Sequence, residues 1–158
     1  MPETPAEVHY ACAALRHYDD AVLLLEAGRL PNADYHFGFA VECALKCLLL
    51  KHTHATMNPV KEGAAPQKKP WVREENQKPK YFGHLPALWT DVALLLHGRS
   101  GSKLVGVLNA SAPFDTWSVD HRYLDGTDAV EADIHNRRAA TESILSLFEQ
   151  ALIAGDLT

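Results

Sequence analysis

The sequence predicts an all-α fold, an up-and-down four-helix bundle with a short extra helix and a long loop rich in proline and lysine. Two observations lead to this prediction. Apolar residues recur at helical spacing in several long segments, and no segment shows the alternation of apolar and polar residues that is typical of a strand. The chain has 158 residues, 47% of them hydrophobic and 22% charged, so we expect a single globular domain over residues 1–158.

Two long helices are predicted early in the chain, at about 5–27 and about 32–51. Apolar residues in the first recur at steps of three, four or seven, which predicts the face that packs against the bundle. That face consists of Val8, Cys12, Leu15, Val22 and Leu25. The second helix is apolar nearly all round, so we expect it at the centre of the bundle, with Glu42 and Lys46 paired one turn apart.

Three more helices are predicted, at about 86–97, at about 103–109, and from just after Thr127 to near the end of the chain. The last of these carries a long stripe at helical spacing, which we expect to be buried. The stripe consists of Val130, Ile134, Arg137, Thr141, Ile144, Leu145, Phe148 and Leu152.

The region 55–82 has a different character, because four prolines interrupt it and residues 61–80 hold six Lys/Arg against three Asp/Glu. Loops of this length without structure of their own are usually functional or disordered. Aromatic side chains tend to dock against other parts of a protein, so Trp71, Tyr81 and Phe82 argue against complete disorder. We therefore interpret this region as a long basic loop.

Composition and missing motifs narrow the class of protein. A net charge of −5 and a pI near 6.0 exclude a strongly basic nucleic-acid binder. No apolar run approaches a bilayer span and no signal peptide is visible, so no membrane association is expected. Three cysteines fit a reducing compartment, which predicts a cytoplasmic protein. Glycine-rich phosphate loops, His-Glu-x-x-His and Cys-x-x-Cys motifs are missing from the sequence, so we expect no cofactor.

The second predicted helix carries a set of candidate metal ligands. His36, Cys43 and Cys47 share one face there, and imidazole with thiolate is a ligand set that zinc takes. The simpler interpretation is that both cysteines are small buried residues and that His36 makes one hydrogen bond. We therefore expect no metal.

Arg29 and His36 are a candidate catalytic pair, separated by six residues. An imidazole can take the proton of a 2′-hydroxyl group, and a guanidinium can stabilise the charge that develops on a phosphodiester. Pro31 interrupts the helix between them, so the spacing alone does not bring the two side chains together. The alternative is that Arg29 binds carbonyl groups at the end of the first helix and His36 packs in the core.

A second group of candidate ligand-binding residues comprises Trp117, His121, Arg122 and Tyr123, with Arg137 further along the chain. A guanidinium near aromatic rings can stack on a base or bind a phosphate group. The alternative is that Trp117 and Tyr123 close one end of the bundle while Arg122 pairs with an acidic residue.

Three stretches are distinctive in their order and spacing: GRLPNADYHFGFAVECALKCLLL, GHLPALW, and a Trp with Arg-Tyr five and six residues later, followed by a long final helix. In these stretches the sequence resembles bacterial HEPN domains (higher eukaryotes and prokaryotes nucleotide-binding). The resemblance covers most of the chain apart from residues 55–80. It implies a helical bundle that often dimerises, with a nucleotide or RNA site on its polar face. Many members are metal-independent ribonucleases of toxin–antitoxin or defence systems.

Three hypotheses follow. The first is a HEPN-like domain that binds a nucleotide or RNA phosphate through Arg122, Tyr123 and neighbouring basic groups. The second is a metal-independent endoribonuclease that uses Arg29 and His36, the only pair here with a spacing close to the family's Arg-to-His pattern. The third is a dimeric interaction module without a ligand, whose partner is an antitoxin or a nucleotidyltransferase-type protein.

Overall fold

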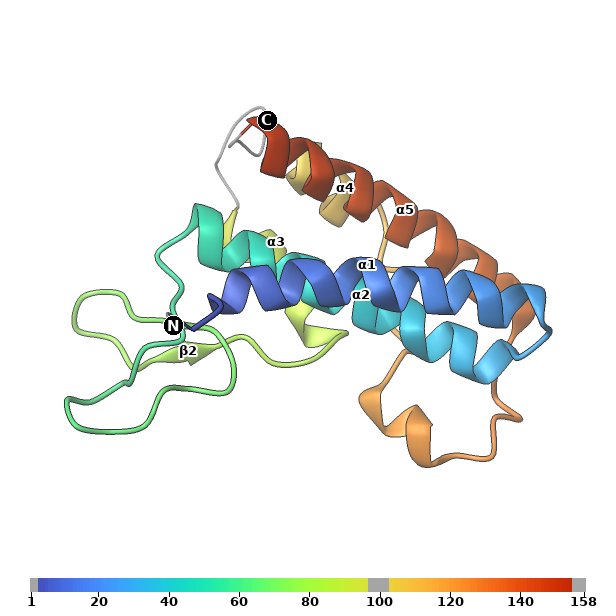
Figure 1. The fold of residues 1–158 in the computed structure, drawn as a ribbon, viewed down its shortest axis with the longest axis horizontal. Coiled ribbons are helices and arrows are strands. Elements are labelled where there is room, and N and C mark those ends of the chain that lie inside the picture. The colour runs from blue at the N-terminus through green and yellow to red at the C-terminus, as the bar shows by residue number, and fades with distance from the viewer. Residues whose placement is uncertain (1–2, 97–102, 155–158) are drawn as a thin grey trace.

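The computed structural model describes residues 3–96 and 103–154, with side chains described up to residue 150, and it is mostly helical (Figure 1). The all-α prediction is confirmed. The helices are α1 (Ala6–Glu26), α2 (Leu30–His52), α3 (Ala87–Leu95), α4 (Lys103–Ala110), the short 3-10 helix η1 (Val119–Tyr123) and α5 (Glu131–Ala154). Among the helices of the described chain, none has both the length and the apolar content that crossing a bilayer requires.

The central helix is α2, as its all-round apolar sequence predicted. Both α1 and α5 pack against it, and α3 and η1 also contact it. Every residue from Ala40 to Leu49 is buried. Gly38 is required at its closest approach to another element, since a Cβ atom there would lie 2.1 Å from the Trp117 ring. The missing side chain therefore makes room for the buried indole.

The predicted packing face of α1 is wrong in its first half. Val8, Cys12 and Leu15 are exposed, whereas Ala14 and Ala21 are completely buried. The reason is that α1 approaches α2 through small side chains, and alanine allows the two backbones to lie close together. Spacing alone favoured the larger apolar residues, which instead face outward.

The predicted stripe of α5 is largely confirmed. Its buried members are Ile134, Arg137, Thr141, Ile144, Leu145 and Phe148. Val130 is an exception, because the helix begins only at Glu131 and the Val130 side chain is 53% exposed. The side chain of Leu152 lies outside the described part of the chain.

The region 55–82 contains two short strands that the sequence did not predict. β1 (Trp71–Val72) and β2 (Lys80–Tyr81) pair antiparallel, with Trp71 opposite Tyr81. The Trp71 indole Nε1 donates a hydrogen bond of 2.7 Å to the carbonyl oxygen of Asn58, and Phe82 is buried. The aromatic residues therefore do dock. Strands of two residues are too short to show alternation, so no pattern in the sequence could predict them.

Candidate functional site

Two arginines from separate elements meet at the beginning of α2. Arg29 directly precedes α2 and Arg122 lies in η1, and both line a surface cavity of about 300 Å³. Asn32, Tyr35 and His121 line the same cavity. We call this the arginine cavity. The arginine cavity brings together Arg29, from the predicted catalytic pair, and His121 and Arg122, from the predicted ligand-binding group.

Local backbone features place these side chains. Gly28 has a φ of +71°, a left-handed conformation that ends α1 and turns the chain into α2. The segment after η1 returns to the same place, because Gly126 packs against Pro31. A Cβ atom at Gly126 would lie 2.6 Å from the ring of Pro31, and the φ of Gly126 is +84°. This contact closes the wall of the arginine cavity.

Arg122 is held by aromatic side chains while its charge stays at the surface. Its guanidinium carbon lies 4.7 Å from the centre of the Tyr123 ring. Hydrogen bonding to Tyr35, and to a smaller extent to Tyr123, raises the pKa of Arg122, so the group is cationic at every physiological pH. Tyr123 itself is 74% exposed and does not line the cavity.

Trp117 lies in the core, away from any ligand surface. It is 1% exposed, and its indole Nε1 donates a hydrogen bond of 3.1 Å to the backbone oxygen of Asp34. Its ring stacks beside that of Tyr35, with centres 6.0 Å apart. A base has no open indole face to stack on, so Trp117 supports the site by positioning Tyr35.

Arg137 is also buried, and its guanidinium group is largely occupied. Nη1 donates to both carboxylate oxygens of Asp34, at 2.7 and 2.9 Å. Nη2 donates to the Thr116 hydroxyl at 2.6 Å, and Nε donates to the backbone oxygen of Pro113 at 3.0 Å. These bonds tie α5 to α2 and to the turn before η1, so the first role of Arg137 is to hold the fold together.

His36 lies apart from the arginine cavity. Its Nδ1 is 3.0 Å from Nδ1 of His17 in α1, and partial burial lowers the pKa of both histidines. A helix rises about 1.5 Å per residue, which separates Arg29 from His36 by about 10 Å along α2. Within the residues that the structure describes, no hydrogen bond or ion pair joins them, and His36 does not line the arginine cavity.

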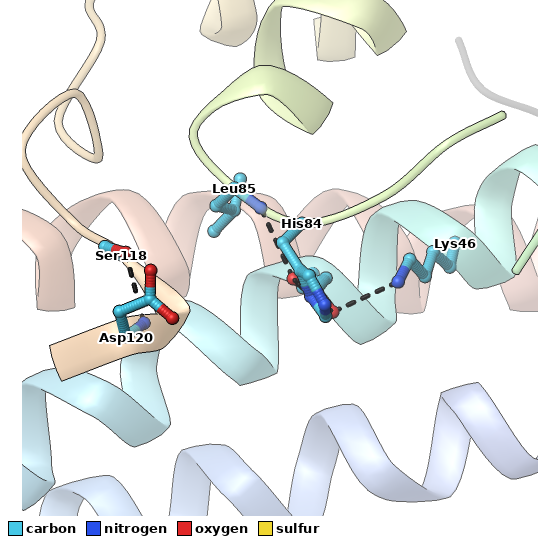
Figure 2. A network of polar contacts seen from close by, with 6 residues as sticks. Lys46, His84, Leu85, Ser118 and Asp120 are labelled. Atoms are coloured by element: carbon cyan, nitrogen blue, oxygen red, sulfur yellow. Dashed lines mark hydrogen bonds and ion pairs between the residues drawn. The ribbon is translucent and has the colours of Figure 1, made fainter. Parts of the chain in front are cut away.

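The conspicuous motif residues Glu42, Lys46 and His84 form a structural network (Figure 2). The Glu42 carboxylate is buried and accepts a hydrogen bond of 3.1 Å from Lys46 Nζ. His84 Nδ1 lies 3.0 Å from the same carboxylate, and the backbone N–H of Leu85 donates to it at 3.3 Å. The predicted Glu42–Lys46 pair is confirmed. The network fastens the segment before α3 to the centre of α2.

Several lining residues of the arginine cavity were missed by sequence reasoning. Asn32 and Tyr35 follow Arg29 at intervals of three residues, which is a weak sign of a shared helical side. Asp125 also lines the cavity and gave no signal in the sequence. In the described part of the chain, no three His, Cys, Asp or Glu side chains are grouped so that they could hold a metal.

Comparisons with protein-family models, with curated proteins and with solved structures found no match for this chain. The resemblance to HEPN domains therefore stays a prediction.

Proposed function

We propose that this protein is a HEPN-like helical domain that binds a nucleotide or an RNA phosphate in the arginine cavity. One observation carries the proposal: Arg29 and Arg122 converge on one cavity from distant parts of the sequence. Arginine binds phosphate oxygens through two parallel N–H groups, and its planar cation also stacks on bases. Asn32, Tyr35 and His121 add hydrogen-bonding groups at the same place.

The charge balance of the cavity supports an anionic ligand. Asp125 is the single carboxylate among its lining residues, against two guanidinium groups. The Asp125 carboxylate accepts hydrogen bonds from the backbone N–H and the hydroxyl of Thr127, at 3.0 and 2.8 Å, and these bonds lower its pKa. Because Asp125 is held by its own turn, the two arginines remain available to a phosphate group.

Binding of a short single-stranded RNA of mixed sequence tests the proposal directly. We expect affinity to fall as salt rises from about 50 to about 200 mM, because each phosphate contact releases counterions. Arg122→Ala and Arg29→Ala should each lower affinity about tenfold or more, as expected for a charge-assisted hydrogen bond.

Arg73→Ala is the matched control, since Arg73 is exposed on the loop and its guanidinium carbon lies 5.6 Å from the centre of the Trp71 ring. Like Arg122→Ala, Arg73→Ala removes one positive charge, but it does so outside the arginine cavity. Equal loss of affinity in all three variants would mean that the whole surface attracts RNA and that the cavity is not the site.

The cellular setting that we propose is a cytoplasmic toxin–antitoxin or defence system, in which the domain forms a homodimer and meets an antitoxin or nucleotidyltransferase-type partner. The exposed apolar side chains of α1, Val8, Leu15 and Leu23, support a surface for self-association. Sedimentation at micromolar concentration should show a dimer. A monomer at every concentration would contradict this part of the proposal.

A metal-independent endoribonuclease is the second candidate, favoured by the state of His36. Its lowered pKa keeps the imidazole neutral at pH 7, which is the form that accepts a proton. Cleavage of mixed RNA in EDTA, lost in His36→Ala and Arg29→Ala with the fold retained, would establish this activity. Cleavage that persists in His36→Ala would remove His36 from it.

A further inference from the structure

The arginine cavity adjoins a second cavity, of about 370 Å³. The two share four lining residues: Pro31, His121, Leu124 and Gly126. They differ in charge, because the second cavity is lined by Asp34, Asp128 and Asp133 with Arg137 as its single arginine. We call this the carboxylate cavity. A ligand that spans both would meet cations at one end and carboxylates at the other.

The carboxylates of the second cavity do not have equal roles. Asp34 is 5% exposed and both of its oxygens accept hydrogen bonds from Arg137, so this pair is neutral and part of the fold. Asp128 and Asp133 lie on the exposed side of the cavity. Both exposed carboxylates thus line the cavity, and a carboxylate oxygen is a hydrogen-bond acceptor only.

The size and the remaining lining of the two cavities suit a small organic ligand. Pockets for such molecules hold about 300–1,000 Å³ and are lined largely by apolar groups with a few convergent polar ones. Pro31, Leu124 and Ala129 supply apolar surface in the carboxylate cavity. A flat ring placed there would lie beside the shared wall, next to the phosphate-binding arginines.

We propose that the two cavities together select a nucleotide whose base carries an exocyclic amino group, such as adenine, cytosine or guanine. The inference rests on the proposed function, since Arg29 and Arg122 hold the phosphate. The amino group then donates hydrogen bonds to Asp133 or Asp128, as carboxylates do toward the amino group of cytosine in nucleic-acid recognition. A base without the amino group leaves these acceptors without a donor.

Asp133 also has a purely structural explanation, which the experiment must separate. It lies in the first turn of α5, where a negative charge stabilises the positive end of the helix. Glu131 lies in the same turn and supplies the same charge, but its carboxylate is 3.6 Å from His135 Nε2 and does not line the cavity. Glu131→Ala is therefore the matched control for Asp133→Ala.

Calorimetric titration with two pairs of 5′-monophosphates tests the inference. The members of each pair differ only in the amino group: adenosine against purine riboside, and guanosine against inosine. We expect the amino-bearing member of at least one pair to bind about tenfold more tightly. Asp133→Ala, Asp128→Ala or the double variant removes the acceptor oxygens and should abolish this difference, whereas Glu131→Ala should keep it.

Equal affinities within both pairs, with binding still reduced by Arg122→Ala, would overturn the inference and leave the proposed function intact. No binding of any of these nucleotides, together with RNA affinity that Arg122→Ala does not change, would overturn both. A preference that persists in the Asp128/Asp133 double variant would place recognition of the amino group outside the carboxylate cavity and would also overturn the inference.

Discussion

The charged groups along α2 fall into two regions that behave in opposite ways. In the interior, Asp34 is paired with Arg137 and Glu42 with Lys46. At the N-terminal end of the helix, Arg29 and Arg122 line an open cavity, and within the described residues neither forms an ion pair. A buried charge is strongly unfavourable unless it is paired, whereas water tolerates an exposed one. We infer that the interior pairs hold the fold and that the exposed arginines serve a ligand.

The largest effect is expected from breaking the Asp34–Arg137 pair. Arg137→Ala leaves the Asp34 carboxylate buried without its cation, and loss of one partner of such a pair costs about 3–5 kcal/mol. Chemical denaturation should show a free energy of unfolding lower by that amount. In the double variant with Asp34→Ala, the loss should be partly recovered. Unchanged stability of Arg137→Ala would contradict the structural role that we assign to this arginine.

A smaller loss is expected at the Glu42 network. Glu42→Gln keeps oxygen as an acceptor for Leu85 and His84 but removes the charge opposite Lys46 Nζ, 3.1 Å away. We expect a loss of about 1–3 kcal/mol, as for other buried groups that lose a charged partner. Thermal unfolding measures it. Glu131→Gln, at an exposed ion pair, is the control and should shift the melting temperature little.

The His17–His36 contact predicts a moderate dependence of stability on pH. Burial lowers the pKa of both histidines from 6.5, so the unfolded chain takes up protons first as the medium is acidified. The contribution of the pair to stability is therefore full above pH 6.5 and is lost as the pH falls from there through the lowered pKa values. His36→Gln should flatten this part of the profile. If stability depended on pH in the same way in His36→Gln and in the wild-type protein, the contribution that we assign to the His17–His36 pair would be refuted.

The smallest effect on stability is expected at Arg122. Its side chain is exposed, and its charge pairs with no acidic group in the described structure. Arg122→Ala should therefore leave the melting temperature unchanged within error. A clear loss of stability in Arg122→Ala would remove the distinction between the two regions.

Gly38→Ala, by contrast, should lower the melting temperature, because a Cβ atom at this position collides with the Trp117 ring.

The sequence predicted the helices well and the surfaces between them less well. Periodicity located α2 and the buried stripe of α5, because long runs of apolar residues leave few alternatives. It misplaced the packing face of α1, where contact is made by the small residues Ala14 and Ala21. It also missed the two-residue strands β1 and β2, which are held by the docking of Trp71 rather than by their own pattern.

The candidate site was predicted residue by residue but not as an arrangement. Arg29, His121 and Arg122 were each recognised, yet Arg29 was assigned to His36 because spacing along the chain was the only guide. What joins Arg29 to Arg122 is the packing of Gly126 against Pro31, a contact between distant segments that no local pattern encodes. The sequence also left two interpretations of Trp117 open, because an aromatic residue near arginine suits either a core or a stacking surface, and the structure places it in the core.

Titration of single-stranded RNA against the wild-type protein, Arg122→Ala and Arg73→Ala at low salt tests the central claim most directly. We expect Arg122→Ala to lose about tenfold or more in affinity with an unchanged melting temperature, and Arg73→Ala to bind like the wild type. Wild-type affinity in Arg122→Ala would contradict the claim that the exposed arginines at the beginning of α2 serve a phosphate ligand.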